Sequence, residues 1–131
     1  RQMISLLDET EDQLHMRIGQ WLDVVLPPGA VWHHSPNEGK RHVAYKVKQK
    51  KMGTKPGWPD IEIFVPGDQS KVGNSIAIFI EVKRPGGKLS ANQAMMREKL
   101  ELAGCFWQLC KSVEQVHEYL NGLIKLRGKQ V

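Results

Sequence analysis

The first regular pattern of apolar and polar positions along the chain is helical. Apolar residues recur at intervals of three and four from Leu7 to Val25, which is the spacing of one face of an α-helix. Thr10 and Gln13 have the spacing of a capping box at its start, and the Pro27-Pro28-Gly29 segment ends it. The pattern predicts a first helix whose apolar face carries one acidic residue, Glu11.

Two strands are predicted in the middle of the chain. Ile61, Ile63 and Val65 alternate with polar or outward positions, so residues 60–65 predict a strand that opens at Asp60. Residues 76–83 are apolar almost to their end, which is typical of an interior strand buried on both faces. The polar connection at residues 66–74 favours a hairpin-like link between the two.

The remaining elements complete an α/β pattern. Residues 30–34 and 105–109 favour two further strands. Residues 41–52 favour a short helix in which Val43, Val47 and either Lys51 or Met52 share a face. Capping spacings at Ser90-x-x-Gln93 and Ser112-x-x-Gln115 begin two more helices. The positions expected on their apolar faces are Met96, Leu100 and Ala103 in the first helix and Val116, Tyr119, Leu120, Leu123 and Ile124 in the second. This order predicts a central mixed β-sheet flanked by helices.

Length and composition narrow the class of protein. With 131 residues, 40% of them hydrophobic, the chain is expected to form one domain over residues 1–131. No apolar run approaches the roughly 20 residues that span a bilayer, and the start does not resemble a secretory signal. We therefore expect a soluble, cytoplasmic protein without a membrane partner. Cys105 and Cys110 lack CxxC spacing, so neither a disulfide framework nor a zinc site is suggested.

The net charge of +5 is concentrated in one segment. Residues 40–55 contain seven lysines and arginines and no acidic residue, which is the charge distribution that attracts a phosphate backbone. The alternative is a solvated helix face. The candidate DNA-binding residues are Asn37, Lys40, Arg41, Lys46, Lys48, Lys50, Lys51 and Lys55.

Candidate chemistry lies at the end of the interior strand. Because side chains alternate along a strand, Glu81 and Lys83 project from one face. Asp60, at the start of the adjacent strand, and the carbonyl oxygen of Val82 complete an oxygen-rich site suited to Mg²⁺ or Mn²⁺. Such an ion would activate water and neutralise a phosphate oxygen, while Lys83 stabilises charge on the phosphorus. The alternative is a plain salt bridge between Glu81 and Lys83.

The combination of motifs is more specific than either part. Pro59-Asp60 followed by Glu81-Val82-Lys83 matches the PD-(D/E)xK nuclease pattern. The segments that flank these residues are His34 to Arg41 (HSPNEGKR), Gly57 to Asp60 (GWPD), Ile80 to Arg84 (IEVKR), Ser90-x-x-Gln93 and Gly104. Together they resemble the VRR-Nuc family, in its short stand-alone form from phages and bacteria, from Glu11 to about Leu120.

The resemblance implies a restriction-endonuclease-like core that binds Mg²⁺ or Mn²⁺ and cuts branched DNA. Stand-alone members are similar to homodimeric Holliday-junction resolvases, whereas the domain fused into larger repair nucleases works on flaps as a monomer. We accordingly expect a homodimer that acts on four-way junctions in a bacterial or phage-infected cell. A flap nuclease, or a DNA-binding module without catalysis, are the alternatives. A module has no use for carboxylates close to phosphates, because each would repel the ligand.

Two further catalytic residues are implied by the resemblance. Glu11 matches the glutamate of the family's first helix, where it would bind the metal, in one arrangement through water. The alternative is a solvated residue favoured by the helix dipole. Gln93 matches the family's glutamine after the ExK strand, but it also fits a capping box with Ser90, and we expect that one rotamer cannot serve both roles.

Two other readings of the polar residues remain open. Glu62 has the strand parity of Asp60, which makes it a possible second ligand or a solvent-facing residue. His33, His34 and His42 invite a zinc interpretation. Neighbouring residues of an extended segment point to opposite faces, however, which weakens it.

Overall fold

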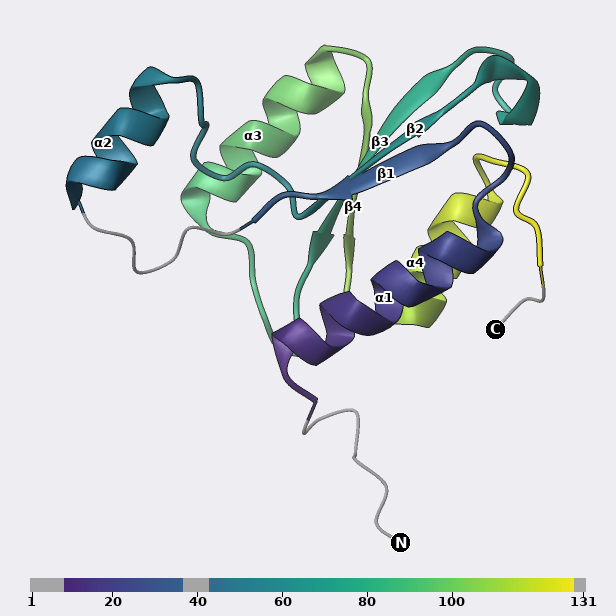
Figure 1. The fold of residues 1–131 in the computed structure, drawn as a ribbon, viewed down its shortest axis with the longest axis horizontal. Helices are drawn as coiled ribbons and strands as arrows, with labels where there is room; N and C mark the ends of the chain where they lie inside the picture. Colours follow the sequence, from purple (N-terminus) through teal and green to yellow (C-terminus); the bar gives the residue numbers. More distant parts are fainter. Residues whose placement is uncertain (1–8, 37–42, 129–131) are drawn as a thin grey trace, which may run out of the picture.

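A four-stranded mixed sheet lies between two layers of helices in the computed structural model, which describes residues 9–36 and 43–128 (Figure 1). The strands are β1 (Val31–His34), β2 (Ile61–Val65), β3 (Ile76–Val82) and β4 (Phe106–Cys110). They stand in the order β1-β2-β3-β4, with β1, β2 and β3 antiparallel and β4 parallel to β3. The helices are α1 (Glu11–Val25), α2 (Val43–Lys51), α3 (Ala91–Leu102) and α4 (Val113–Asn121), and a 3-10 turn η1 (Gly67–Gln69) links β2 to β3. The predicted mixed sheet flanked by helices is confirmed.

Helix α1 begins where the capping box was predicted. The Thr10 hydroxyl accepts a hydrogen bond from the Gln13 backbone N–H, and the Gln13 side chain accepts one from the Thr10 N–H. These reciprocal bonds satisfy backbone donors that a helix start leaves without partners. The helix therefore starts at a defined residue and presents Glu11 in its first turn.

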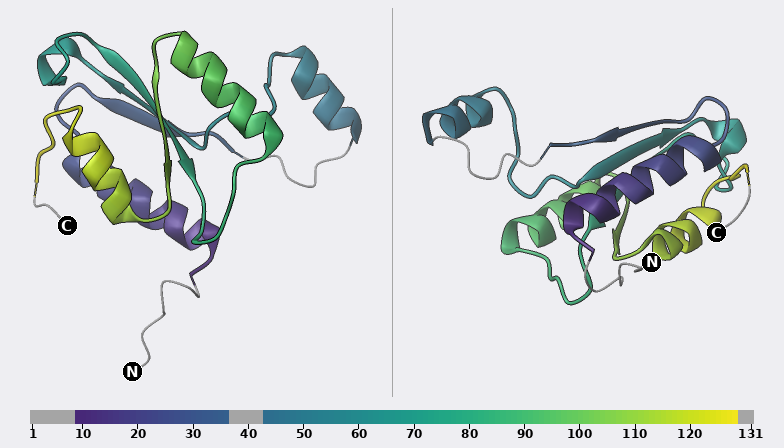
Figure 2. Two further views of the ribbon diagram at one scale, coloured as in Figure 1. Left: turned by 180° about the vertical axis from the view of Figure 1, so that it is seen from behind. Right: turned by 60° about the horizontal axis from the view of Figure 1, so that its bottom comes forward.

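Helices α1 and α4 cover one face of the sheet (Figure 2). The side chains between them form the main hydrophobic core, and β3 contributes through its even-numbered positions because successive strand residues point to opposite faces. Its fully buried members include Ile18, Leu22, Ile61, Ile63, Ile78, Ile80, Val82, Val116, Leu120 and Ile124. This core fixes α1, and with it the first helical turn, against β2 and β3.

Helix α3 covers the opposite face over β3 and β4. Met96 and Leu100 form a second buried cluster with Phe79 and Trp107, and the Arg97 guanidinium lies 4.7 Å from the centre of the Trp107 ring. The N-terminus of α3 is thereby held near the end of β3. This placement brings residues that start a helix beside residues that end a strand.

The predicted short helix is present as α2, but its apolar residues do not pack against the rest of the protein. None of its residues is buried, and Val43 and Val47 are 74% and 49% exposed. Met52, just after the helix, is 64% exposed. The helix lies to one side of the sheet, beyond α3 in Figure 1. Because it contributes nothing to the core, its sequence is free to be basic.

The remaining differences from the sequence prediction are local. Strand β4 runs from Phe106 rather than Cys105, and Ala103, expected on the buried face of α3, is exposed. Leu123 and Ile124 lie beyond the end of α4. The side chain of Ile124 is buried in the core, and its backbone forms an isolated β-bridge with Ser70. Among the described residues, no helix is long and apolar enough to cross a membrane.

Candidate active site

The loop before β2 is held tightly against the start of α3. Gly57 has a φ of +75°, and a Cβ atom there would lie 2.3 Å from the Asn92 carbonyl oxygen. Only glycine fits both this backbone conformation and this close approach. Trp58 then packs edge-on against Phe79, with 5.5 Å between ring centres. The loop therefore delivers Asp60 to a fixed position beside the sheet.

Asp60 is anchored to the end of β3. Its Oδ2 accepts a hydrogen bond of 2.8 Å from the Val82 backbone N–H, and its own carbonyl oxygen accepts one from Ser35 N. Ile61 pairs with Ile80 in the antiparallel register, so one step further along the ladder Asp60 comes beside Glu81. The predicted neighbourhood of the two carboxylates is thus present, and it is the amide of Val82 that contacts Asp60.

Glu81 is the buried carboxyl group of the site. Its side chain is 2% exposed, its Oε2 accepts a hydrogen bond of 3.1 Å from Gln93 Nε2, and its Oε1 has no partner in the described part of the chain. Burial, and then the neighbouring Asp60 carboxyl, raise the pKa of Glu81 to about 9, although the positive charge of Lys83 opposes the shift. A buried carboxyl oxygen without a hydrogen-bond partner, beside a second carboxyl group, is unfavourable in its charged form, and a nearby cation would stabilise that form.

Gln93 performs two roles with a single rotamer. Its Oε1 accepts a hydrogen bond from Ser90 N at 2.9 Å, which completes the capping box of α3, while its Nε2 donates to Glu81. The expectation that one rotamer cannot serve both roles is wrong. An amide has an acceptor and a donor on opposite sides of one carbon, and the two partners lie on those two sides.

Lys83 follows the last residue of β3 and is half-buried. Its backbone N–H continues the ladder with a hydrogen bond to the Cys110 carbonyl oxygen. Glu81 and Lys83 do not form the plain salt bridge that was the alternative prediction. The carboxyl group of Glu81 is hydrogen-bonded to Gln93 instead. The Lys83 ammonium is close enough to lower the pKa of Glu81 without being ion-paired to it.

Glu11 lies in the first turn of α1 on the side of the sheet where Asp60 and Glu81 meet. It is half-buried, and its charge adds to the causes that raise the pKa of Glu81. The position of Glu11 on the apolar stripe of the sequence suggested that its side chain points into the core. The structure shows that it does not. It lines a groove between α1 and β1 that also reaches Asp60.

These residues bring together the ends of four elements, and comparison with known proteins agrees with that arrangement. A family model for the VRR-NUC domain matches residues 8–114. The chain belongs to the VRR-NUC domain family. A solved structure described as a VRR_NUC domain protein aligns with a TM-score of 0.69 over 89% of each chain at 24% sequence identity, which supports the fold. No curated protein matches the chain significantly. Membership of this family indicates a nuclease of the PD-(D/E)xK type, with DNA as its substrate.

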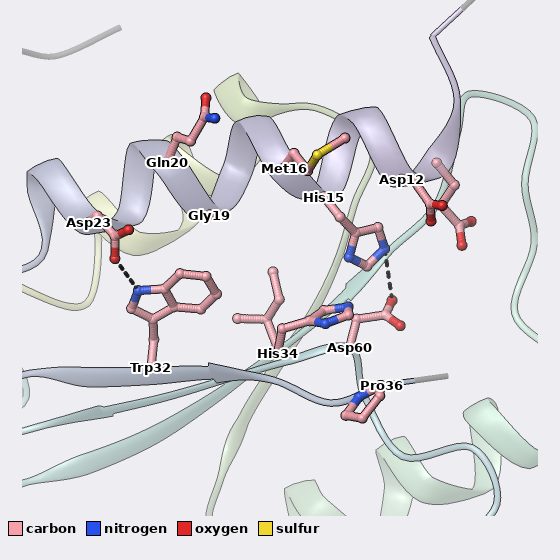
Figure 3. Close-up of a pocket in the computed structure, with 12 residues that line it drawn as sticks. Asp12, His15, Met16, Gly19, Gln20, Asp23, Trp32, His34, Pro36 and Asp60 are labelled. Atoms are coloured by element: carbon pink, nitrogen blue, oxygen red, sulfur yellow. Dashed lines mark hydrogen bonds and ion pairs between the residues drawn. The ribbon is translucent and has the colours of Figure 1, made fainter. Parts of the chain in front are cut away.

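The surroundings of Asp60 in this VRR-NUC domain include a histidine that the sequence patterns did not single out. His15 lies one turn after Glu11 on α1, and its Nε2 is 3.9 Å from Asp60 Oδ2 (Figure 3). Its ring meets His34 edge-on at 5.0 Å between centres. Burial, followed by the charge of His15, lowers the pKa of His34. The spacing of four residues from Glu11 was the signal available in the sequence, since residues so spaced share a helix face.

Glu62 and the histidines of β1 have other partners than a metal. Glu62 Oε1 accepts a hydrogen bond from Ser35 Oγ at 3.1 Å and lies 3.4 Å from His33 Nδ1. His33 and His34 point to opposite faces of β1, as expected for neighbours in a strand, and His42 lies outside the described residues. Within residues 9–36 and 43–128, no three His, Cys, Asp or Glu side chains gather closely enough to hold a metal ion.

The basic segment is only partly described. Lys46, Lys48, Lys50 and Lys51 are all exposed on α2, and Lys55 is exposed in the following loop. Asn37, Lys40 and Arg41 lie outside the described residues. The described part of the segment, residues 43–55, has no acidic side chain, so its lysines form a positive surface on a helix that the core does not use.

Proposed function

We propose that this VRR-NUC domain is a metal-dependent, structure-selective endonuclease that hydrolyses phosphodiester bonds in branched DNA, and specifically that it acts as a Holliday-junction resolvase. One observation carries the proposal: Asp60, the buried Glu81 and the Lys83 that is not ion-paired to it meet where β2 begins and β3 ends. Two carboxylates and an ammonium group are what phosphodiester hydrolysis in this superfamily needs.

The carboxylates fit a divalent cation. Glu81 has an unpartnered buried oxygen, and the Asp60 carboxyl beside it raises the pKa of Glu81. A cation held by Asp60 and Glu81, with Glu11 and the Val82 carbonyl oxygen as further ligands, would remove that cost, and hard oxygen donors favour Mg²⁺ or Mn²⁺. When bound, such an ion supplies Lewis-acid activation of water and neutralises charge on the phosphate.

The residues of the chain have separate tasks in this scheme. The Val82 amide and the Gln93 amide fix the orientations of Asp60 and Glu81 by hydrogen bonds of 2.8 and 3.1 Å. Carboxylates that are held in place need little rearrangement during the reaction. Lys83 places its positive charge beside them, where it stabilises the negative charge that develops on the phosphorus oxygens in the transition state.

The lysines of α2 supply affinity for DNA rather than chemistry. The lysines are exposed on α2, which lies to one side of the sheet (Figure 1): Lys46, Lys48, Lys50 and Lys51. Each contact with a phosphate releases counterions, so the affinity they provide is sensitive to salt and independent of base sequence. This separation allows selection of a substrate by its shape.

A four-way junction has two equivalent strands to cut, and a two-fold homodimer with one site in each subunit matches that symmetry. We therefore propose a homodimer as the active form. A monomer acting on flaps is the alternative within the same chemistry, and the two differ in the products they release: symmetric nicks in two strands for the dimer, and a single cut at the branch for the monomer.

The test is cleavage of a labelled four-way junction, a flap and a plain duplex in Mg²⁺, Mn²⁺ or EDTA. Lys83→Ala is the inactive variant, and Lys99→Ala, which removes an exposed lysine from the last turn of α3, is the matched control. We expect metal-dependent symmetric nicking of the junction by the wild type and by Lys99→Ala only. Tight binding of the junction without cleavage of any substrate would overturn the proposal.

Metal binding has a readout of its own. Mn²⁺ should raise the melting temperature of the wild type, because a ligand that binds only the folded state stabilises it. Asp60→Asn should abolish this rise, and Glu62→Gln, which alters a carboxylate held by Ser35, should preserve it. An equal rise in all three proteins would place the ion elsewhere.

A further inference from the structure

A groove of about 710 Å³ runs between α1 and β1 and reaches Asp60. Gly19 is part of its lining, and a Cβ atom at this position would lie 2.9 Å from the Trp32 ring, so the absence of a side chain lets the indole approach the helix closely. Trp32 Nε1 donates a hydrogen bond of 2.8 Å to Asp23 Oδ1, which fixes the ring in that orientation (Figure 3). Asp60 belongs to the lining of this groove, so the groove and the site are continuous.

The side chains that line the groove repel the phosphate group of a nucleotide and can bind its base. Asp12 and Asp23 contribute carboxylates to its lining, and Glu11 adds a third at the end near the site. Phosphate groups would be repelled by these charges, so the DNA backbone does not lie in the groove. Trp32 and the exposed ring of His34 supply aromatic surface, which binds flat rings by stacking. The groove therefore suits a planar group without negative charge.

We propose that this groove binds an unpaired nucleobase of the nucleotide next to the scissile phosphate, an inference that rests on the proposed nuclease function. The phosphate would lie at Asp60 and Glu81 while the base points along α1 toward Trp32. The volume lies in the range, roughly 300–1,000 Å³, of pockets that enclose small molecules. Gln20 also belongs to the lining of the groove, although its amide points away from Trp32 (Figure 3).

The base pocket gives a physical reason for selecting branched DNA. A base inside a duplex must be unstacked and unpaired before it can enter a pocket, whereas a base in a single strand is already unpaired. A matched four-way junction has no unpaired base, so on that substrate a base pair at the branch point would have to open first. The groove would therefore favour substrates with an unpaired nucleotide beside the cut. Plain duplex would be disfavoured even where the lysines of α2 bind it well.

The first experiment compares a branched substrate with the same substrate carrying an abasic nucleotide on either side of the cut. Stacking of one base contributes roughly tenfold or more to affinity, so KM should rise by about that factor when the base is missing, with a smaller change in kcat. Equal KM values for the intact and abasic substrates would overturn the base pocket while leaving the nuclease function intact.

The second experiment fills the groove. Met16 lines it and is 58% exposed, whereas Met95, on α3 outside the groove, is 55% exposed. Met16→Trp should remove most of the difference in KM between the intact and abasic substrates, and Met95→Trp should preserve it. His34→Ala, which removes an exposed aromatic ring from the groove, tests the same pocket should Met16→Trp fold poorly. If all three variants keep the wild-type ratio, the proposal fails.

A binding measurement separates the two proposals. In EDTA, a short single-stranded oligonucleotide carrying 2-aminopurine should be quenched by the wild type, because the base stacks on aromatic rings. It should be quenched less by His34→Ala, which removes one of those rings from the groove, than by Met95→Trp. Quenching without cleavage of any DNA would leave the pocket standing and the catalytic proposal refuted. Cleavage without quenching, together with equal KM values, would do the reverse.

Discussion

The side-chain amide of Gln93 joins the start of a helix to the buried carboxyl group of the site. Its oxygen accepts a hydrogen bond from Ser90 N, and its nitrogen donates one to Glu81 Oε2 at 3.1 Å. The capping box of α3 and the orientation of Glu81 thus depend on one rotamer. Loss of either interaction leaves the other weaker, because the amide is held at both ends.

Two substitutions of Gln93 separate these roles. Gln93→Glu keeps an oxygen for the Ser90 N–H and so keeps the cap, but it cannot donate to Glu81 when ionised. Gln93→Ala loses both interactions and should lower the free energy of unfolding by about 1 kcal/mol. We expect both variants to lose cleavage in a junction-cleavage assay. In urea denaturation, only Gln93→Ala should lose the free energy of unfolding that the helix cap contributes. If Gln93→Ala cleaves DNA as fast as the wild type, the role of Gln93 is limited to capping α3.

Glu81→Gln should lose cleavage and gain stability in the metal-free protein. The pKa of Glu81 is about 9 in the folded chain, against an ordinary value of 4.5, so the folded state binds this proton more tightly than the unfolded state. Stability from this group is complete below pH 4.5 and declines as the pH rises toward 9. A glutamine at this position does not titrate, so the stability of Glu81→Gln should not decline with pH in this way.

The measurement is the difference in melting temperature between Glu81→Gln and the wild type in EDTA at pH 5 and pH 8.5. We expect the advantage of the variant to be larger at the higher pH. Asp68→Asn, which changes an exposed carboxylate in η1, is the control and should show no such trend. A difference that stays constant with pH would contradict the assignment of this shift to Glu81.

Replacement of Lys46, Lys48, Lys50 and Lys51 by alanine should weaken DNA binding and flatten its dependence on salt. The slope of log K against log salt should fall by about one unit for each lysine that contacts a phosphate. Because α2 buries none of its residues, the melting temperature should change little. Fluorescence anisotropy at several salt concentrations provides the measurement. An unchanged slope would show that α2 does not contact the backbone.

Gly57→Ala should destabilise the loop that carries Asp60. The new Cβ would lie 2.3 Å from a backbone oxygen at a φ of +75°, which adds a clash to the strain of a left-handed residue. We expect a loss of about 2 kcal/mol or more, with loss of cleavage. Gly73→Ala, at a φ of +90° with no atom within 4 Å, isolates the strain. Equal losses in chemical denaturation would refute the contribution of the close approach.

Much of the fold followed from local pattern. The helical spacing before Val25, the alternation after Asp60 and the apolar run of β3 each occur where the elements do, because burial of one face or two faces leaves a period in the sequence. The capping boxes at Thr10 and Ser90 were equally visible. What pattern could not show is the exposure of Val43 and Val47 on α2, since a helical period does not reveal whether another element packs against it.

The site was predictable to the extent that its residues lie in motifs. Asp60, Glu81 and Lys83 carry a recognisable spacing, and the structure places Asp60 and Glu81 side by side. The spacing of His15 from Glu11 places both residues on one face of a helix, but the proximity of His15 to Asp60 depends on how α1 packs against the sheet, which spacing along the chain does not encode. The double role of Gln93 depends on the distance between two elements in space. Both follow from tertiary packing, and sequence reasoning therefore missed them.

The four elements whose ends meet at the carboxylates are distributed over most of the chain, from Glu11 to Gln93. Contacts between such distant segments form late, after loop-closure entropy has been overcome. The lysines of α2 are neighbours in the sequence and stay clustered in a partly unfolded chain, whereas Asp60 and Glu81 are brought together only by folding. Partial unfolding would therefore spare the positive segment and remove the arrangement on which the proposed cleavage depends.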